Sequence, residues 1–233
     1  ATAFITILAL INFNLDGLGF TAAVPRMVDT IIGCALAWFG VSFIFPDWKF
    51  RRLPRTIKRS LQAQCNYLIE VVAQYKDGRN NGLNYRVVRR AAHNNDADVA
   101  SLISTLATEP DFDPVQKTQA FEFLCLNHTF ISYIAALGAH REKIQDQEIL
   151  MLLDKAVEDI QGALLRDEVP DLTVQNMLQT IRHRLSQNND EDQKSLIVLQ
   201  QLSLMFSILG QLSRLKQNLS HDHDQRATEL ASL

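Results

Sequence analysis

The sequence predicts an all-α protein in which C-terminal membrane helices are followed by a cytoplasmic up-and-down helical bundle. Three observations support this prediction. The run from Met27 to Phe45 is apolar over a helix length and carries one charge, Asp29. A dense cluster of cations follows it, with no acid among them. In the rest of the chain, apolar residues recur at spacings of three and four, as on one face of a helix, and no convincing strand alternation occurs.

The apolar run is long enough to cross a bilayer. Its nineteen residues, at about 1.5 Å each, span roughly the hydrocarbon core. Trp48 follows where an interfacial aromatic residue is expected, and the cations after it mark the cytoplasmic side. We expect these juxtamembrane cations to contact the anionic headgroups of membrane lipid. They are Lys49, Arg51, Arg52, Arg55, Lys58 and Arg59. A buried core helix is the alternative, but it leaves the tryptophan and the cations unexplained.

The first residues extend the membrane region. Ala1 to Leu15 is apolar, but as a helix it reaches only about 22 Å, which is short of a full span. It has no basic start and no small-residue cleavage site, unlike a signal peptide. We interpret it as the second half of a truncated membrane helix, joined to the next helix by an outside loop at Asp16–Thr21. Residues 1–47 are therefore expected to form membrane helices.

The remaining charge and the cysteines exclude some classes of function. The chain has 26 acidic and 23 basic residues, and six of the basic ones are the juxtamembrane cations. The rest is distinctly acidic, so we expect no nucleic-acid partner, because such proteins need a cationic face. The three cysteines are odd in number and match neither a disulfide framework nor a zinc site. Reduced, packed thiols are expected.

Beyond a basic juxtamembrane segment at 48–60, we expect a helical bundle over 61–219 and a flexible tail over 220–233. Pro54 is expected to start the first long helix, and Asn84 to cap the second. Leucines at three- and four-residue spacing in the last helix favour packing inside the bundle, with a coiled coil between subunits as the alternative. The expected helices are 54–75, 85–108, 115–140, 146–165, 172–186 and 193–219.

A charged pair opens the apolar run. Arg26 and Asp29 are three residues apart, so they share one helix face, and ionisable groups at membrane depth usually face a cavity or a partner. One interpretation is a substrate or coupling pair near the outer mouth. The favoured alternative is an interfacial charge pair within reach of headgroups. Gly33, Ala37 and Gly40 form a small-residue stripe that would allow close helix packing, with the ordinary glycine content of membrane helices as the alternative.

A second polar motif lies at residues 84–96. One polar stripe recurs at spacings of three and four, and its members are Arg86, Arg89, Arg90, His93 and Asp96 or Ala97. The arginine and histidine side chains could grip a carboxylate or phosphate, because arginine offers a fork of donors. The favoured alternative is a buried or inter-helix salt-bridge network, for example with Glu122 or Glu142.

No motif indicates catalysis or a metal site. His128 and His140 share a face but lack nearby ligands at suitable spacing, and the histidines of the tail resemble a metal site only in composition. Nucleophile elbows, phosphate-binding glycine loops and HExxH motifs do not occur. We therefore expect no enzyme activity, no cofactor and no metal.

Four strings together resemble the YccS/YhfK branch of the fusaric acid resistance (FUSC) family of bacterial inner-membrane proteins. The strings are Arg26–Gly33, Phe45–Trp48, Tyr85–Asn94 and Ser132–Arg141, so the likeness covers most of residues 1–165. The resemblance implies a C-terminal fragment of a longer protein that has two rounds of membrane bundle and cytoplasmic domain. It implies a membrane role for Arg26, Asp29 and Gly33. It also marks a cytoplasmic motif comprising Tyr85, Arg86, Arg89, Arg90, His93, Asn94 and His140.

Wider relatives of that family export aromatic carboxylic acids, so the resemblance implies a transporter or efflux component for organic acids. The cytoplasmic part, residues 49–233, would then contribute its helical bundle to regulation or assembly. The competing hypothesis is a membrane-anchored interaction or scaffold module without transport. Expected partners are membrane lipid, the rest of the full-length membrane protein and further copies in a homo-oligomer. We expect a multi-pass protein of the bacterial inner membrane.

Overall fold

The computed structural model describes residues 19–40, 49–108, 113–166, 171–187 and 193–231. The chain divides into two compact units, Ala1–Trp48 and Lys49–Leu233. Every regular element among the described residues is a helix, which confirms the all-α prediction for them.

The described helix of the first unit is α2, Gly19–Phe39. It contains most of the predicted membrane run, whereas residues 41–48, including Trp48, lie outside the described residues. We expected an outside loop at Asp16–Thr21. Residues 19–21 belong to helix α2 instead, so the prediction is wrong for these three residues. The physical reason is that Phe20 to Val24 continue the apolar pattern without a breaker.

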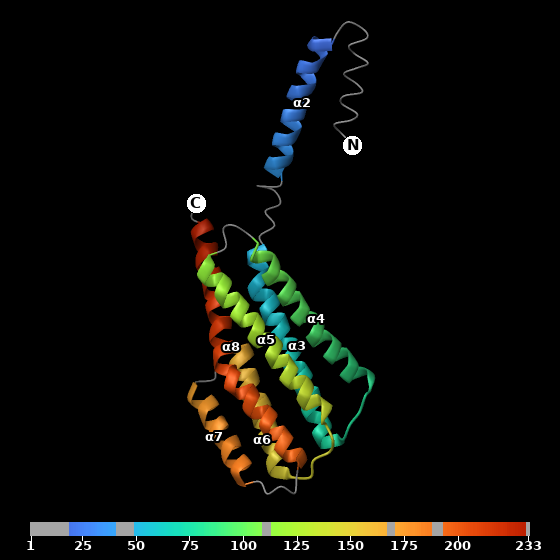
Figure 1. Ribbon diagram of the computed structural model, residues 1–233, viewed down its shortest axis with the longest axis vertical. Helices are drawn as coiled ribbons and strands as arrows, with labels where there is room; N and C mark the ends of the chain where they lie inside the picture. The colour runs from blue at the N-terminus through green and yellow to red at the C-terminus, as the bar shows by residue number, and fades with distance from the viewer. Residues whose placement is uncertain (1–18, 41–48, 109–112, 167–170, 188–192, 232–233) are drawn as a thin grey trace. The chain divides into compact units, whose positions relative to one another are not determined.

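The second unit is a bundle whose successive helices run antiparallel (Figure 1). The central helix α3 contacts α4, α5, α6 and α8, and α8 also packs against α5 and α7. Short connections between antiparallel neighbours are typical of an up-and-down bundle. Its elements are α3 (Lys49–Asp77), α4 (Leu83–Leu106), α5 (Pro114–Ala139), α6 (Gln147–Gln161), the π-helical turn η2 (Gly162–Arg166), α7 (Asp171–Gln187) and α8 (Gln193–Ala231).

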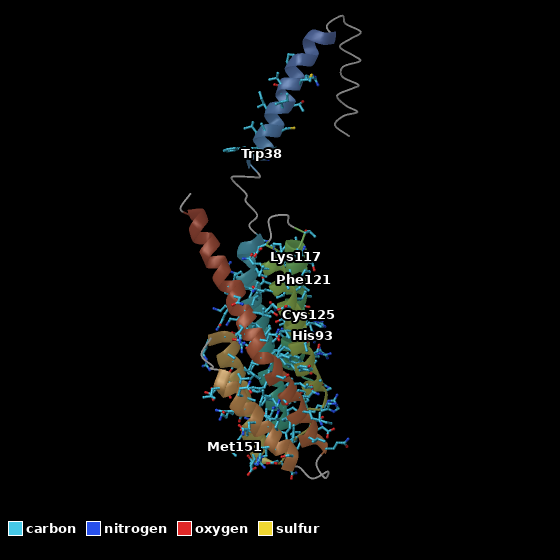
Figure 2. All side chains as sticks on the ribbon, turned by 60° about the vertical axis from the view of Figure 1, so that its left-hand side comes forward. Trp38, His93, Lys117, Phe121, Cys125 and Met151 are labelled. Atoms are coloured by element: carbon cyan, nitrogen blue, oxygen red, sulfur yellow. The ribbon has the colours of Figure 1, made fainter. Side chains whose placement is uncertain are left out.

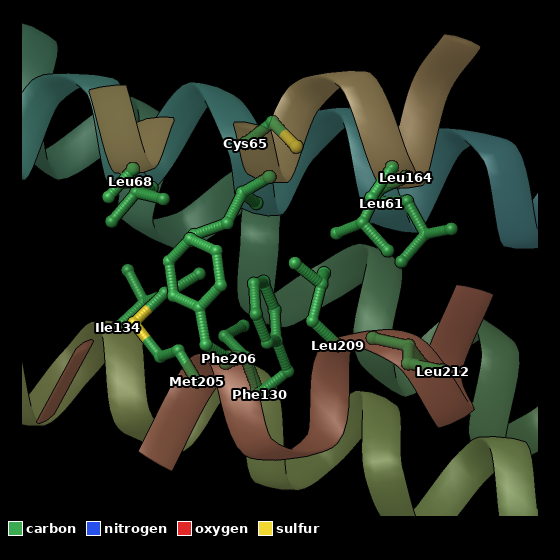
Figure 3. Close-up of a cluster of buried hydrophobic side chains, with 14 of the residues drawn as sticks. Leu61, Cys65, Leu68, Phe130, Ile134, Leu164, Met205, Phe206, Leu209 and Leu212 are labelled. Carbon is green, nitrogen blue, oxygen red and sulfur yellow. The ribbon is translucent and has the colours of Figure 1, made fainter. Parts of the chain in front are cut away.

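Every helix of the bundle contributes to one core, and Figure 3 shows the part of it between α3, η2, α5 and α8. Burying one such apolar side chain contributes about 1.5–3 kcal/mol, so this core is the main stabilising feature of the bundle. The regularly spaced apolar residues of α8 are buried within this chain, which confirms packing inside the bundle. The buried side chains in the close-up include Leu61, Cys65, Leu68, Phe130, Ile134, Leu164, Met205, Phe206, Leu209 and Leu212.

Three predicted helix ends are wrong. Helix α3 begins at Lys49, so Pro54 is its sixth residue and not its first. A proline at this position costs the helix one backbone hydrogen bond, to the carbonyl of residue 50. Leu53 and Ile57 on either side are buried, and this packing holds the first turns in place. Asn84 does not cap α4: the cap is Gly82, and the Asn84 side chain donates to Glu70 at 2.6 Å. Helix α8 continues to Ala231, because no glycine or proline follows Leu219.

The α3–α4 connection contains a tight turn at Gly78. Gly78 has a φ of 95°, in the left-handed region where a side chain is unfavourable, and its amide donates to the Gln74 carbonyl at 2.9 Å. This bond satisfies one carbonyl of the last turn of α3, and the Ile144 amide satisfies the next one, at Tyr75, at 3.0 Å.

Two bundle segments, Pro114–Ala139 and Gln193–Ser220, are long and apolar enough to cross a bilayer. Both pack their apolar faces into the core of the bundle. Their outward faces are mixed: Lys117 and Glu122 of α5 and Gln211 and Arg214 of α8 are exposed. Val115, Phe121 and Leu204 are exposed as well. An apolar inner face with charged residues on the outer face also suits a core helix of a water-exposed bundle, so length and composition do not by themselves place these helices in a membrane.

Candidate functional site

The charged pair predicted in the membrane run lies on α2. Arg26, Asp29 and Gly33 occupy neighbouring positions on one face of the helix, and all three are exposed. A Cβ built on Gly33 would meet no atom within 4 Å, so this face leaves room for a closely packed helix. Thr30 Oγ1 donates to the Arg26 carbonyl at 2.8 Å, which is a local backbone contact.

Large apolar side chains surround this pair on α2. Ile31 is 64% exposed, Leu36 66% and Trp38 69%. Figure 2 shows Trp38 projecting from the helix. Exposed apolar side chains on every side of a helix indicate an apolar surrounding, such as lipid or other membrane helices.

The described juxtamembrane cations lie on the first turns of α3. Arg52, Arg55, Lys58 and Arg59 are exposed, and the side chains of Lys49 and Arg51 lie outside the described residues. Arg55 and Lys58 are one turn apart and line a pocket together with Lys216 of α8. The sequence placed the cations in one cluster but gave no sign that a third cation from α8 joins two of them.

The predicted cytoplasmic motif divides into one buried residue and an exposed stripe. Tyr85 is buried, whereas Arg86, Arg89, Arg90, His93 and Asn94 are exposed on α4, and His140 is exposed at the end of α5. Within the described residues, no ion pair joins the three arginines to an acid. Glu142 pairs instead with Lys194, at 2.5 Å. Among the described residues, these arginines therefore take no part in the expected salt-bridge network, because their side chains point outward from the bundle. Asp96 of the same stripe does pair between helices, with His128 of α5 at 2.8 Å.

Arg141 connects the end of α3, the start of α4 and the end of α5. No structural role for it was predicted from the sequence. It is 5% exposed, and its Nε donates to Gln74 Oε1 at 2.7 Å. Its other nitrogens donate to the Gly138 carbonyl and to Asn81 Oδ1. Its guanidinium carbon lies 4.0 Å from the centroid of the Tyr85 ring. A cation held by neutral acceptors and an aromatic face clamps α3, α4 and α5 together.

A second network connects the middle of α3, α4 and α5. The buried carboxylate of Asp96 accepts from Asn127 Nδ2 at 2.7 Å and contacts His128 Nδ1 at 2.8 Å. Asn127 also bonds Ser60 and accepts from Gln64 at 3.1 Å. Burying a carboxylate is costly unless it is paired, and these partners supply the pairing. The signal in the sequence was the pair of polar residues, Ser60 and Gln64, on the apolar face of α3.

Burial shifts the pKa of several groups in this part of the bundle. Desolvation lowers the pKa of His93 below its usual 6.5, and the nearby Arg89 adds to the effect. Burial, chiefly, raises the pKa of Tyr67, which shares a hydrogen bond with Tyr85 at 3.2 Å. Burial also raises the pKa of the Cys65 thiol to about 12. Cys65 is therefore expected to be unreactive, whereas Cys125 is exposed.

Within the described residues, no group of three or more His, Cys, Asp or Glu side chains could hold a metal ion. The three cysteines are free.

The sequence is similar to those of several bacterial proteins. It is 46% identical over 221 residues, 94% of its length, to the inner membrane protein YccS of Escherichia coli, and it spans 31% of that protein. The chain is a YccS-like membrane protein. It is also 35% identical over 147 residues to an uncharacterized protein of Haemophilus influenzae, with 63% of this chain and 20% of that protein covered. No family model and no solved structure matches the chain.

Proposed function

We propose that the chain is the C-terminal part of a bacterial inner-membrane transporter or efflux component for organic acids, with aromatic carboxylic acids as the first class to test. We further propose that it belongs to the YccS/YhfK branch of the fusaric acid resistance family. The similarity to the E. coli inner membrane protein supports the membrane assignment, and the chain spans less than a third of that protein. Transport itself rests on the family resemblance, which is an associational argument.

Helix α2 carries the proposal, because its described side chains from Pro25 to Phe39 are exposed and mostly apolar. In this proposal residues 1–47 cross the membrane and residues 49–233 lie in the cytoplasm. The excess of cations on the first turns of α3 supports this orientation, because such residues concentrate on the cytoplasmic side. Those cations would contact anionic headgroups.

Arg26 and Asp29 are the residues to which we assign the substrate or the coupling ion. Their shared face carries both charges of α2 and the open position at Gly33. A cation beside the path attracts a carboxylate, and a neighbouring acid could exchange a proton as the substrate passes. We assign no catalytic group and no cofactor.

A growth assay tests this proposal. Cells lacking the full-length gene are grown with a panel of aromatic and other organic acids and complemented with wild type, Arg26→Ala, Asp29→Ala or Ile31→Ala. Ile31→Ala is the matched control, because Ile31 is an exposed residue on the opposite face of α2. We expect hypersensitivity that wild type and Ile31→Ala rescue and the two charge variants do not.

Two results would contradict the proposal. Rescue by all four proteins would remove the assigned role of Arg26 and Asp29. Absence of hypersensitivity to any acid in the panel would remove support for organic-acid export.

The second candidate function is a membrane-anchored interaction module without transport. The exposed arginines of α4, which lack acidic partners within the described residues, favour it. Cross-linking of the full-length protein in membranes tests it, with Arg86→Glu/Arg90→Glu as the variant. Loss of a cross-linked partner or homo-oligomer in this variant would support the module, and unchanged cross-linking would oppose it.

A further inference from the structure

A pocket lies at the end of the bundle where α3 begins. Its volume is about 350 Å³, near the lower end of the range of roughly 300–1,000 Å³ that is usual for ligand sites. Three elements build it: the first turns of α3, the π-helical turn η2 and the turns of α8 that hold Lys216 and Ser220. The lining residues are Pro54, Arg55, Ile57, Lys58, Leu164, Leu165, Lys216 and Ser220.

The charge of this pocket has one sign. Arg55, Lys58 and Lys216 all line it, and none of the lining residues is acidic. Like charges that face one cavity repel each other, and a bound anion would relieve this repulsion. Arginine and lysine are the side chains that bind carboxylate and phosphate, the first as a fork and the second as a point charge.

The third cation is held in position by η2. Lys216 Nζ donates to the Leu164 carbonyl at 3.0 Å, and Ser213 Oγ donates to the Ala163 carbonyl at 3.0 Å. These bonds occupy two carbonyl groups of the π-helical turn. They leave the positive charge of Lys216 at the pocket and fix α8 against η2. Single π-helical turns occur frequently at functional sites.

The other walls of the pocket are apolar. Ile57 and Leu164 are buried and belong to the bundle core, and Pro54 and Leu165 complete the lining. A fully hydrated inorganic ion would leave these walls without a partner. A molecule with an anionic head and a short apolar body would satisfy both parts of the lining.

We propose that this pocket binds an organic anion whose phosphate or carboxylate head contacts Arg55, Lys58 and Lys216 and whose apolar body packs on Pro54 and Leu165. The anion could be supplied by an anionic lipid or by a soluble metabolite of the same chemistry. Arg55 is ten residues beyond Phe45, where the apolar run ends. The site goes beyond the transport proposal and does not depend on it, because binding is measured without transport.

Calorimetric titration of the full chain in nonionic detergent tests the site. The probes are hexyl phosphate, inorganic phosphate and hexanol. Two double variants are compared: Arg55→Gln/Lys58→Gln removes two pocket cations, and Arg52→Gln/Arg59→Gln removes two exposed cations of the same helix that do not line the pocket. The net charge of the two variants is equal. Circular dichroism confirms that each variant is folded.

We expect saturable binding of hexyl phosphate, with at least about tenfold weaker binding of inorganic phosphate and none of hexanol. The pocket variant should lose about tenfold or more in affinity, because it removes two of the three cations that line the pocket. The control variant should stay within about twofold of wild type. Equal losses in both variants, or no saturable binding to the folded wild type, would overturn the proposal.

The same titration in lipid nanodiscs distinguishes the two sources. If the natural occupant is a lipid, nanodiscs that contain phosphatidylglycerol should weaken hexyl phosphate binding relative to phosphatidylcholine nanodiscs, and the pocket variant should lose this difference. If the occupant is a soluble anion, binding should be the same in both nanodiscs. Either result supports the pocket as an anion site and assigns its source.

Discussion

Replacing Arg141 with alanine is expected to lower the thermal midpoint of the bundle by about 6–12 °C. The side chain is buried and donates to Gln74, Gly138 and Asn81, and its guanidinium lies over the Tyr85 ring. Each hydrogen bond from a charged group contributes about 1.5–3 kcal/mol. The variant would leave the Gly138 carbonyl and the Asn81 side chain without this donor.

The net effect is smaller than the sum of these bonds. Gln74 Oε1 still accepts from the Asn80 amide at 3.0 Å, and removing a buried cation also removes its desolvation cost. We therefore expect a net loss of about 3 kcal/mol. In a domain of 150–250 residues, one kcal/mol shifts the midpoint by about 2–4 °C, which gives the stated range.

Far-UV circular dichroism of the full chain in detergent measures this midpoint. Arg86→Ala is the matched control, because Arg86 is exposed on α4 and pairs with no acid within the described residues. The control should shift the midpoint by less than about 2 °C. The midpoint of Arg141→Lys should lie between those of the two alanine variants, since lysine keeps the positive charge but lacks the planar set of donors of the guanidinium group. An Arg141→Ala midpoint equal to that of Arg86→Ala would refute the clamp.

Three further predictions use the same measurement. Asp96→Ala should lower the midpoint by about 4–10 °C, because it leaves buried donors unpaired. Asp98 is exposed, so Asp98→Ala should change the midpoint little. Equal shifts in the two variants would contradict the role of the Asp96 network. Gly138→Ala should lower the midpoint by about 2–4 °C, because the added Cβ would lie 3.2 Å from Tyr67 Oη. A higher midpoint would show that the neighbouring side chains move aside, and it would contradict this prediction. The folded-state pKa of His93 lies below 6.5, so the unfolded chain binds the proton more readily and stability falls as the pH drops through that value. When the pH is lowered from about 7.5 to about 5.5, the thermal midpoint of the wild type should therefore fall further than that of His93→Gln. An equal fall in both proteins would contradict the lowered pKa of His93.

The fold was predictable where apolar spacing is regular. Leu202, Phe206 and Leu209 recur at three and four, and all three are buried, because one face of α8 meets the core. Helix ends were less predictable. Pro54 was expected to start α3, but the buried Leu53 before it favours five more helical residues over the local preference of proline.

The side-chain networks could not be predicted in the same way. Asp96 meets Asn127 from 31 residues away, and Gln64 meets Asn127 from 63 residues away, so their pairing follows from how the helices pack. Arg141 and Gln74 are 67 residues apart, and no local pattern connects them. The arginine stripe was found from its spacing, but its direction was not, because periodicity shows that residues share a face without showing which way that face points.

Labelling of Cys125 tests the central claim, that an inner-membrane segment is followed by a cytoplasmic bundle, most directly. Cys125 is exposed on α5, as Figure 2 shows. A full-length variant whose sole cysteine is Cys125 is treated with a membrane-impermeant maleimide in spheroplasts, before and after permeabilisation. A cytoplasmic bundle predicts no labelling of intact spheroplasts and full labelling after permeabilisation. Labelling of intact spheroplasts would contradict the proposed orientation.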